Sequence, residues 1–346
     1  MKAARFMGVE QIEIGEIPAP TPKDDEILAK IAYAGYCGTD MDLLDGSMVH
    51  IRNGFTKYPL VPGHEWSGTV VAVGKNVRRF AVGDRVTADV SLGCGCCDYC
   101  HHGRYNLCPD REVIGSYRNR QGAFAEYIAV PERHTYRIPD GVSMEEAALA
   151  EPAATAAYAV RRSNIQMGDR VLVIGDGPIG QLAAQLAGIE GAAQVIVAGS
   201  WDEKLSIARQ CGASATINYH KSDVAAEAIA MTDGAGPDVI IESSGNQTAL
   251  AQAVQALKPG GTLSLISWYH DSEIPLPVNA MITKDCTVVC SLASPNSFLP
   301  VLKYMAVGKL KARPLITHIR PLEELEDVVG LIRAKKEMRI KILLKP

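Results

Sequence analysis

Two hydrophobic patterns divide the chain near residue 150. Before that point, short alternating or β-branched runs are interrupted by glycine and proline, for example at 26–33, 68–74 and 83–87. Alternation with a period of two residues is typical of strands that bury one face. We therefore expect a partly open β-barrel with long loops in residues 1–152.

The pattern changes after Glu151-Pro152. An alanine-rich helix leads to an apolar run at 170–174, which is typical of a strand buried on both faces of a parallel sheet. Strands and helices then alternate. Further strands are expected at 194–198, 215–219, 238–243, 262–267 and 287–292. Helices are expected at 179–190, 202–211, 222–231 and 247–257. Six strands with crossover helices predict a doubly wound parallel sheet, that is, a Rossmann domain.

The last stretch of the chain predicts a return to the first domain. Helices are expected near 298–307 and 322–334, and the apolar run at 339–344 has the pattern of a strand. We therefore expect the Rossmann domain, 153–292, to be an insertion in a catalytic domain made of 1–152 and 293–346.

A glycine-rich loop at 175–180, Gly-Asp-Gly-Pro-Ile-Gly, follows the first Rossmann strand and opens the first helix. In such loops the first glycine permits a tight turn, and the second lets the backbone approach a pyrophosphate. The third lets the helix pack closely on the sheet. The residues predicted to contact a dinucleotide are Gly175, Gly177, Pro178, Ile179 and Gly180.

The end of the second Rossmann strand favours NADP(H) modestly over NAD(H). An NAD site carries an acidic residue there, which accepts hydrogen bonds from the adenine ribose. Here the strand ends in Gly199-Ser200-Trp201, and no carboxylate follows until Asp202 and Glu203. A 2′-phosphate would meet no repulsion from that strand end, and Ser200 could donate a hydrogen bond to it. The alternative is that Asp202 reaches the ribose from the next helix.

Five of the nine cysteines lie between Cys94 and Cys108. Because the N-terminal residues lack the pattern of a secretion signal, we expect reduced thiols and metal ligation rather than disulfides. Four thiolates complete a tetrahedral shell, which is the pattern of a structural zinc. Cys96 is an additional thiol whose spacing fits less well. The four predicted ligands, in a lobe at about 93–109, are Cys94, Cys97, Cys100 and Cys108.

A second set of ligand-type residues is dispersed along the chain. Cys37 lies in Gly-Tyr-Cys-Gly-Thr-Asp, His64 and Glu65 form a Gly-His-Glu, and Glu151 precedes a proline. Cysteine, histidine and carboxylate ligands with one open position are typical of a catalytic zinc. Spacing alone leaves open whether these residues converge.

Over essentially its full length, the chain resembles the zinc-dependent medium-chain alcohol dehydrogenase family. The resemblance rests on the Gly-His-Glu and four-cysteine motifs, the glycine loop, and four further segments at 68–70, 83–86, 258–261 and 314–318. Within that family, Glu151-Pro152 is similar to the polyol (sorbitol) dehydrogenase branch. The resemblance implies a GroES-like catalytic domain whose zinc is held by Cys37, His64 and Glu151, with Glu65 as a further ligand or exchange partner.

The resemblance also implies roles for individual residues. Thr39 would take the proton of the alcohol, Thr155 would pack against the nicotinamide, and Gly199, Ser200 and Tyr219 are similar to residues of NADP-using secondary-alcohol dehydrogenases. A helix-terminal role for the Thr155 hydroxyl is an alternative.

The chain also departs from the family pattern. Asp42 stands where the family's proton relay has a histidine, and Trp201 stands where NADP-using members have a basic residue. The segment at 291–294 lacks the arginine-aromatic pair of sorbitol dehydrogenases.

These features predict a zinc enzyme that transfers hydride between a secondary alcohol and a nicotinamide cofactor. Glu151 and a polar loop at 45–57, with His50, Arg52, Asn53 and Lys57, favour a polyol, a cyclitol or a sugar-alcohol phosphate as the small-molecule substrate. The alternatives are a simple secondary-alcohol dehydrogenase or ketone reductase, a zinc-free quinone reductase, and a non-catalytic NADPH-binding protein.

Charge and hydropathy indicate which classes of binding partner are unfavourable. The net charge is −4 and no basic stripe is present, which argues against nucleic-acid binding. No apolar run reaches the roughly 18 residues of a membrane span, so a cytoplasmic protein is expected. The apolar strand predicted at 286–292 would lie at a sheet edge, which favours a homodimer or homotetramer.

Overall fold

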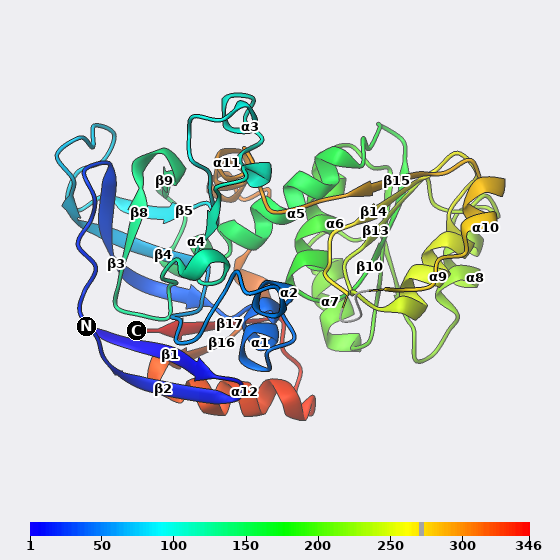
Figure 1. The fold of residues 1–346 in the computed structure, drawn as a ribbon. Helices are drawn as coiled ribbons and strands as arrows, with labels where there is room; N and C mark the ends of the chain where they lie inside the picture. Colours follow the sequence, from blue (N-terminus) through cyan, green and yellow to red (C-terminus); the bar gives the residue numbers. More distant parts are fainter. Residues whose placement is uncertain (270–272) are drawn as a thin grey trace. The chain divides into compact units, whose positions relative to one another are not determined.

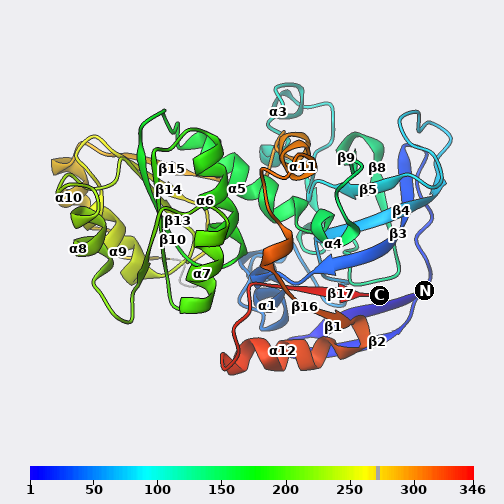
Figure 2. The same ribbon diagram turned by 180° about the vertical axis from the view of Figure 1, so that it is seen from behind.

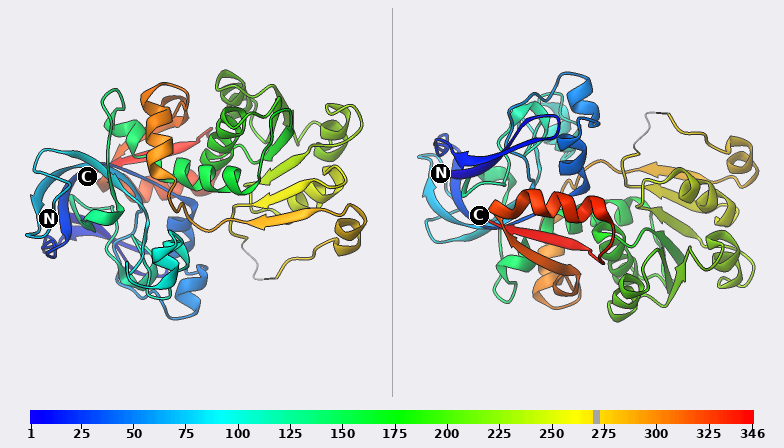
Figure 3. Two further views of the ribbon diagram at one scale, coloured as in Figure 1. Left: turned by 90° about the horizontal axis from the view of Figure 1, so that it is seen from above. Right: turned by 90° about the horizontal axis from the view of Figure 1, so that it is seen from below.

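The chain folds into two units, each of which gathers segments that are distant in sequence. The computed structural model describes residues 1–269 and 273–346. The first unit comprises Met1–Ala154, Ala293–Val307 and Ile316–Pro346, and the second comprises Thr155–Leu292 and Gly308–Leu315. Both chain termini belong to the first unit, as Figure 3 shows.

A seven-stranded sheet forms the body of the first unit (Figure 1). In order, its strands are β16 (Ile316–Pro321), β17 (Lys341–Lys345), β3 (Glu26–Gly35), β4 (Glu65–Val73), β5 (Arg85–Ala88) and β9 (Thr135–Arg137), while β8 (Tyr127–Pro131) pairs with β3. The register between β3 and β4 shifts twice, and such irregularities bend a strand. The bend lets β3 pair with β17, β4 and β8, which confirms the partly open barrel.

Shorter elements surround this sheet. The strand pairs are β1 (Lys2–Gly8) with β2 (Gln11–Glu16), and β6 (Ser91–Leu92) with β7 (Glu112–Val113). The helices are α1 (Gly38–Leu44), α2 (Val49–Arg52), α3 (Asp98–His101), α4 (Met144–Ala147), α11 (Phe298–Ala306) and α12 (Leu325–Ala334). A core of wholly buried side chains, including Phe6, Ile27, Trp66 and Phe124, lies beneath them.

The C-terminal return differs in detail from the sequence prediction. The predicted helix at 322–334 begins with a 3₁₀ turn at Leu322–Glu324, and only Leu325–Ala334 is α-helical. The predicted final strand is β17, and β16 is an additional strand that pairs with it in parallel. Figure 2 shows α12 beside β16.

A six-stranded parallel sheet forms the second unit, as predicted. Its order is β12 (Ala215–Asn218), β11 (Gln194–Gly199), β10 (Arg170–Ile174), β13 (Val239–Glu242), β14 (Thr262–Leu265) and β15 (Thr287–Cys290). The order reverses between β10 and β13, and ligands of doubly wound sheets bind at such a switch point, outside the carboxyl ends of the strands.

Helices cover both faces of this sheet (Figure 1). They are α6 (Pro178–Ile189), α7 (Asp202–Gln210), α8 (Val224–Ala230), α9 (Gln247–Ala256) and α10 (Val278–Thr283), and they are preceded in the chain by α5 (Ala150–Arg162), which begins in the first unit. Alternate strand residues such as Leu172, Ile196 and Ile240 share one core with α8 and α9. The intervening residues point to the opposite face, where α6 and α7 lie. Both faces of the central strands β10, β11 and β13 are buried, which explains their nearly continuous apolar sequences.

Among the helices of residues 1–269 and 273–346, none combines the length and the apolar character that crossing a membrane requires.

Candidate metal centres and dinucleotide loop

Three residues of the dispersed set come together in the first unit. Cys37 immediately precedes α1, and His64 and Glu65 stand at the start of β4. The ligand atoms of Cys37, His64 and Glu65 all lie within 4.8 Å of one another. His64 and Glu65 are buried and Cys37 is half-buried. A thiol, an imidazole and a carboxylate at this separation form a donor set suited to zinc.

Asp40 orients this group, a role that the sequence analysis missed. Its carboxylate is fully buried and accepts hydrogen bonds from the backbone N–H of Cys37 (2.9 Å) and of Gly63 (3.1 Å). Its Oδ1 lies 3.8 Å from Nδ1 of His64. Asp40 therefore ties the loop before α1 to the loop before β4. A carboxylate behind a histidine is the usual partner that fixes the ring of a metal ligand.

Lys341 is a second residue that the sequence analysis did not identify. Its Nζ donates to both carboxylate oxygens of Glu65, at 2.7 and 2.6 Å, and to the carbonyl of Tyr36 at 3.0 Å. Burial lowers the pKa of Lys341, but the nearby charges, Glu65 foremost, raise it above its ordinary value overall. The lysine is therefore charged, and it bonds to the carboxylate oxygens of Glu65 that a metal ion would use.

The strand register explains why this pair forms. Gly35 of β3 is opposite both Glu65 of β4 and Leu343 of β17. A Cβ on Gly35 would lie 2.1 Å from Oε2 of Glu65, so only glycine leaves room for the carboxylate. Lys341 shares a face of β17 with Leu343 because alternate residues of a strand point the same way.

Glu151 is buried in the first turn of α5, in the first unit. Among the described side chains, it does not belong to the group within 4.8 Å. It is nevertheless one of the charges that raise the pKa of His64. In the structure, Glu65 is therefore the carboxylate beside Cys37 and His64. Glu151 lies outside this group and acts on His64 through its charge.

The electrostatics of this group favour a bound cation. Burial lowers the pKa of His64, whereas Cys37, Asp40 and Glu151 raise it, and the net shift is well above the ordinary value. Among the described residues, Nδ1 of His64 has no hydrogen-bond partner. Buried acidic groups that draw a proton onto a histidine would draw a divalent cation in the same way.

The four-cysteine lobe lies between β6 and β7. The Sγ atoms of its four cysteines all lie within 4.8 Å of one another, and these cysteines are Cys94, Cys97, Cys100 and Cys108. Backbone N–H groups of Cys96 and Cys97, with the Cys96 thiol, lower the pKa of Cys94 to about 6. Cys96 is exposed, with its Sγ 3.5 Å from that of Cys94, and does not belong to the four. The lobe suits a closed, structural zinc site.

The glycine loop has the shape that a pyrophosphate needs. Gly175 follows β10 with a φ of +124°, and a Cβ on Gly180 would lie 1.9 Å from the carbonyl oxygen of Gly175. Gly177 caps α6, and a Cβ there would meet nothing within 4 Å. The first and third glycines thus permit close packing, whereas the second faces open space beside the helix N-terminus.

Asp176 brings a carboxylate to the end of β11, which the sequence analysis missed. Its Oδ2 accepts hydrogen bonds from the Ser200 N–H (2.7 Å), the Ser200 hydroxyl (3.1 Å) and the Trp201 N–H (3.2 Å). Asp202 instead receives hydrogen bonds from Asn218 and Lys221. A carboxylate reaching over from the neighbouring loop leaves no local pattern in the sequence.

The remaining predicted residues occupy several elements. Thr39 is half-buried in α1, and Thr155 is half-buried within α5 rather than at a helix end. The N–H of Tyr219 donates to the carbonyl of Gly199 at 3.1 Å, which places Tyr219 beside the end of β11.

The polar loop at 45–57 contains the short helix α2. His50 packs edge-on against Tyr117, with ring centroids 4.7 Å apart, whereas Arg52, Asn53 and Lys57 are exposed.

Comparisons with known proteins agree with this geometry. The family model "Alcohol dehydrogenase GroES-like domain" matches residues 23–140, and "Zinc-binding dehydrogenase" matches residues 178–306. Sorbitol dehydrogenase of Bacillus subtilis is 32% identical over 346 residues, which is 100% of this chain and 97% of that protein. D-arabitol-phosphate dehydrogenase of Enterococcus avium is 31% identical, and the match covers 98% of this chain and 96% of that protein.

Among solved structures, a Sinorhizobium meliloti 1021 protein bound to NADP superposes with a TM-score of 0.91. It is 32% identical in sequence, and the match covers 100% of this chain and 99% of that one.

Proposed function

The chain belongs to the zinc-dependent medium-chain alcohol dehydrogenases, and from this premise we propose a polyol, a cyclitol or a sugar-alcohol phosphate as its substrate. It is a nicotinamide-dependent oxidoreductase that interconverts an alcohol and a carbonyl compound. The group of Cys37, His64 and Glu65 supports the zinc-dependent reaction, and the observation that carries the substrate class is the buried carboxylate of Glu151, which acts on His64 from outside that group. The relatives named for sorbitol and D-arabitol phosphate support this substrate class.

Cys37, His64 and Glu65 would hold the catalytic zinc, and Glu151 would be a further ligand or exchange partner. When bound, zinc supplies a Lewis acid for the substrate oxygen, and the nicotinamide supplies the hydride acceptor or donor. Asp40 holds the two ligand loops in place through the backbone N–H groups of Cys37 and Gly63. Lys341 keeps both oxygens of Glu65 paired while the carboxylate is not bound to metal.

Other residues of the chain would move the proton and seat the cofactor. Thr39, two residues after Cys37, would accept the hydroxyl proton of the substrate. Gly175, Gly177 and Gly180 would admit the pyrophosphate of the cofactor at the start of α6, and Thr155 would pack against the nicotinamide. The NADP(H) preference remains a prediction from Gly199 and Ser200, and it requires the Ser200 hydroxyl to be available as a donor.

A substrate panel tests the proposed class. The purified protein is assayed with sorbitol, xylitol, myo-inositol, arabitol phosphate, 2-butanol and ethanol, each with NAD and with NADP. We expect kcat/KM to be highest for a polyol, a cyclitol or a polyol phosphate. Highest turnover of 2-butanol would instead favour a simple secondary-alcohol dehydrogenase, and activity confined to ethanol would overturn the substrate class.

Metal content tests the second part of the proposal, that each chain holds two zinc ions. Elemental analysis should give two zinc ions per chain for the native protein and for Cys96→Ser, the matched control. Cys97→Ser and Cys37→Ser should each retain one. A native content of one zinc would favour a non-catalytic binding protein that keeps only the cysteine lobe.

Assembly is the third part of the proposal. β15 is an edge strand of the six-stranded sheet, and its neighbourhood exposes apolar side chains at Leu276, Val278, Ile282 and Val288. Unpaired strand edges and contiguous apolar surface are features that protein association covers. We expect a homodimer, or a tetramer built from it, through this edge.

A further inference from the structure

We propose that Asp176, in the glycine loop, sets the choice between a 2′-hydroxyl and a 2′-phosphate on the cofactor, and that it favours NAD(H). The proposal rests on the nicotinamide-dependent function above. It reverses the preference that Gly199 and Ser200 predict by themselves.

The first argument is the position of the carboxylate. The N–H of Gly175 donates to the carbonyl of Ala198 at 2.9 Å, which holds the loop against the end of β11. A Cβ built on Gly199 would lie 2.5 Å from Cβ of Asp176 and 2.6 Å from its Oδ2. The Asp176 side chain therefore fills the space that a side chain at the end of the second strand would occupy. The acidic group that this strand end lacks comes instead from the loop after the first strand.

The second argument is how firmly this anion is held. Three donors converge on Oδ2, the N–H and hydroxyl of Ser200 and the N–H of Trp201, at 2.7 to 3.2 Å. Oδ1 lies 3.5 Å from Nζ of Lys204, and both side chains are largely buried. These donors and the neighbouring ammonium hold the Asp176 carboxylate in one position at the end of β11.

The consequence for the cofactor follows from charge. The Ser200 hydroxyl and the Lys204 ammonium, the two groups suited to a 2′-phosphate, are both turned to Asp176. A 2′-phosphate at the end of β11 would meet a carboxylate, whereas a ribose hydroxyl could donate a hydrogen bond to it. Repulsion that NADPH meets and NADH does not meet is an effective source of specificity.

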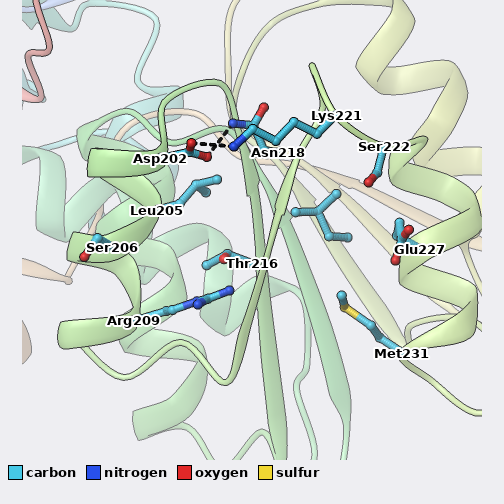
Figure 4. Close-up of a pocket in the computed structure, with 11 residues that line it drawn as sticks. Asp202, Leu205, Ser206, Arg209, Thr216, Asn218, Lys221, Ser222, Glu227 and Met231 are labelled. Carbon is cyan, nitrogen blue, oxygen red and sulfur yellow. Dashed lines mark hydrogen bonds and ion pairs between the residues drawn. The ribbon is translucent and has the colours of Figure 1, made fainter.

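Asp202, the other carboxylate near this strand end, is engaged elsewhere. Its oxygens accept hydrogen bonds from Asn218 Nδ2 at 2.7 Å and Lys221 Nζ at 2.6 Å. Figure 4 shows these three side chains together at a pocket between α7, β12 and α8. Asp202 is thus a carboxylate of the same neighbourhood that does not contact Ser200, which makes it a matched control.

Fluorescence titration with NADH and NADPH tests the proposal in the full-length protein. We expect the native protein to bind NADH more tightly. Asp176→Asn keeps an oxygen for the Ser200 and Trp201 donors but removes the charge, and it should shift the Kd ratio toward NADPH by at least about tenfold. Asp202→Asn should leave the ratio within about twofold of native. Calorimetric titration with 2′,5′-ADP and 5′-ADP should show the same shift without any turnover.

Lys204→Met, made in the native protein and in Asp176→Asn, tests the cofactor preference in a second way if Asp176→Asn by itself folds poorly. Lys204→Met leaves the Asp176 charge unpaired and should shift the ratio further toward NADH. In the Asp176→Asn background, the same change should remove much of the gain in NADPH binding. Thermal unfolding of each variant shows which ones are folded.

Three results would overturn this proposal and leave the proposed function intact. They are an unchanged ratio of the NADH and NADPH Kd values in Asp176→Asn, an equal shift of that ratio in Asp202→Asn, and tighter binding of NADPH than of NADH by the native protein. If the native protein bound neither dinucleotide, the proposed function would fail with it.

Discussion

Lys341 is bonded to a carboxylate that would also serve as a metal ligand. Both oxygens of Glu65 are bonded to Lys341 Nζ, although Glu65 also lies within ligand distance of Cys37 and His64. A buried ion pair is weak evidence for stability, but removal of one partner leaves an uncompensated charge. The charge balance at this site therefore depends on whether a cation is present.

Lys341→Met should make stability depend on zinc. In chelator-treated protein, the variant should lose about 3–5 kcal/mol because Glu65 is left buried and unpaired. Added zinc should restore much of that loss, since Glu65 can then bind the ion. Thermal unfolding with and without chelator checks this, with Lys345→Met at the exposed end of β17 as control. Equal losses in the two conditions would contradict the competition.

His134, a buried histidine near the cysteine lobe, should make the free energy of unfolding fall at acidic pH. Burial lowers the pKa of His134 to about 4, below the ordinary value of 6.5. The folded chain keeps His134 neutral while the unfolded chain protonates it. Its contribution is therefore fully present above about pH 6.5 and is lost as the pH falls toward 4.

His134→Gln should remove this pH dependence. The difference in unfolding free energy between native protein and variant should change by roughly 3 kcal/mol between pH 7 and pH 4, to the disadvantage of the native protein. Burial raises the pKa of Asp89 to about 6, so its contribution is present at low pH and lost as the pH rises through 6. Asp89 is in both proteins, so this opposite trend cancels in the difference. Denaturant unfolding at several pH values measures it, and a constant difference would refute the prediction.

At the scale of elements, different glycines of the 175–180 loop serve the packing of the fold and the binding of a ligand. Gly180 is in close contact with the backbone of Gly175, whereas Gly177 faces open space. The same motif therefore contains one glycine required by the packing of α6 on β10 and one available to a ligand.

Alanine substitutions should show this division. Gly180→Ala must displace a backbone carbonyl and should destabilise the second unit by roughly 1–3 kcal/mol. Gly177→Ala should leave unfolding nearly unchanged but weaken dinucleotide binding at least about tenfold, because the methyl occupies the approach of the pyrophosphate. Calorimetric unfolding and NADH titration together check both results. A destabilised Gly177→Ala with native affinity would contradict this assignment.

At the scale of the whole molecule, apolar side chains are exposed beside the edge strand β15. Ile282 of α10 is 69% exposed, and Val288 of β15 is also exposed. A second copy of the chain, paired edge to edge along β15, would bury both the strand edge and these side chains.

Ile282→Glu should weaken this association. A charge in the centre of an apolar interface costs binding free energy because it loses its water. Light scattering across a concentration series should give a dimer or tetramer for native protein and a larger monomer fraction for the variant. Val307→Glu, an equally exposed apolar site outside this patch, is the control. A native protein that is monomeric at all concentrations would contradict the prediction.

Several features follow from the sequence by itself because they depend on residues close together in the chain. The apolar strands of the parallel sheet, the 175–180 loop and the spacing from Cys94 to Cys108 are local patterns, and the structure has each of them. Strand ends differ by a few residues, and β16 was not predicted, because packing rather than local pattern decides where strand pairing begins.

Only the tertiary structure decided the charges around the two sites. Lys341 reaches Glu65 from 276 positions away, and Asp176 supplies to β11 a carboxylate that the strand itself lacks. Coulomb interactions and desolvation depend on distance and burial in space, neither of which residue spacing determines. The sequence alone therefore indicated which chemistry this protein carries, while the folded chain decided which carboxylates lie beside Cys37 and His64 and at the end of β11.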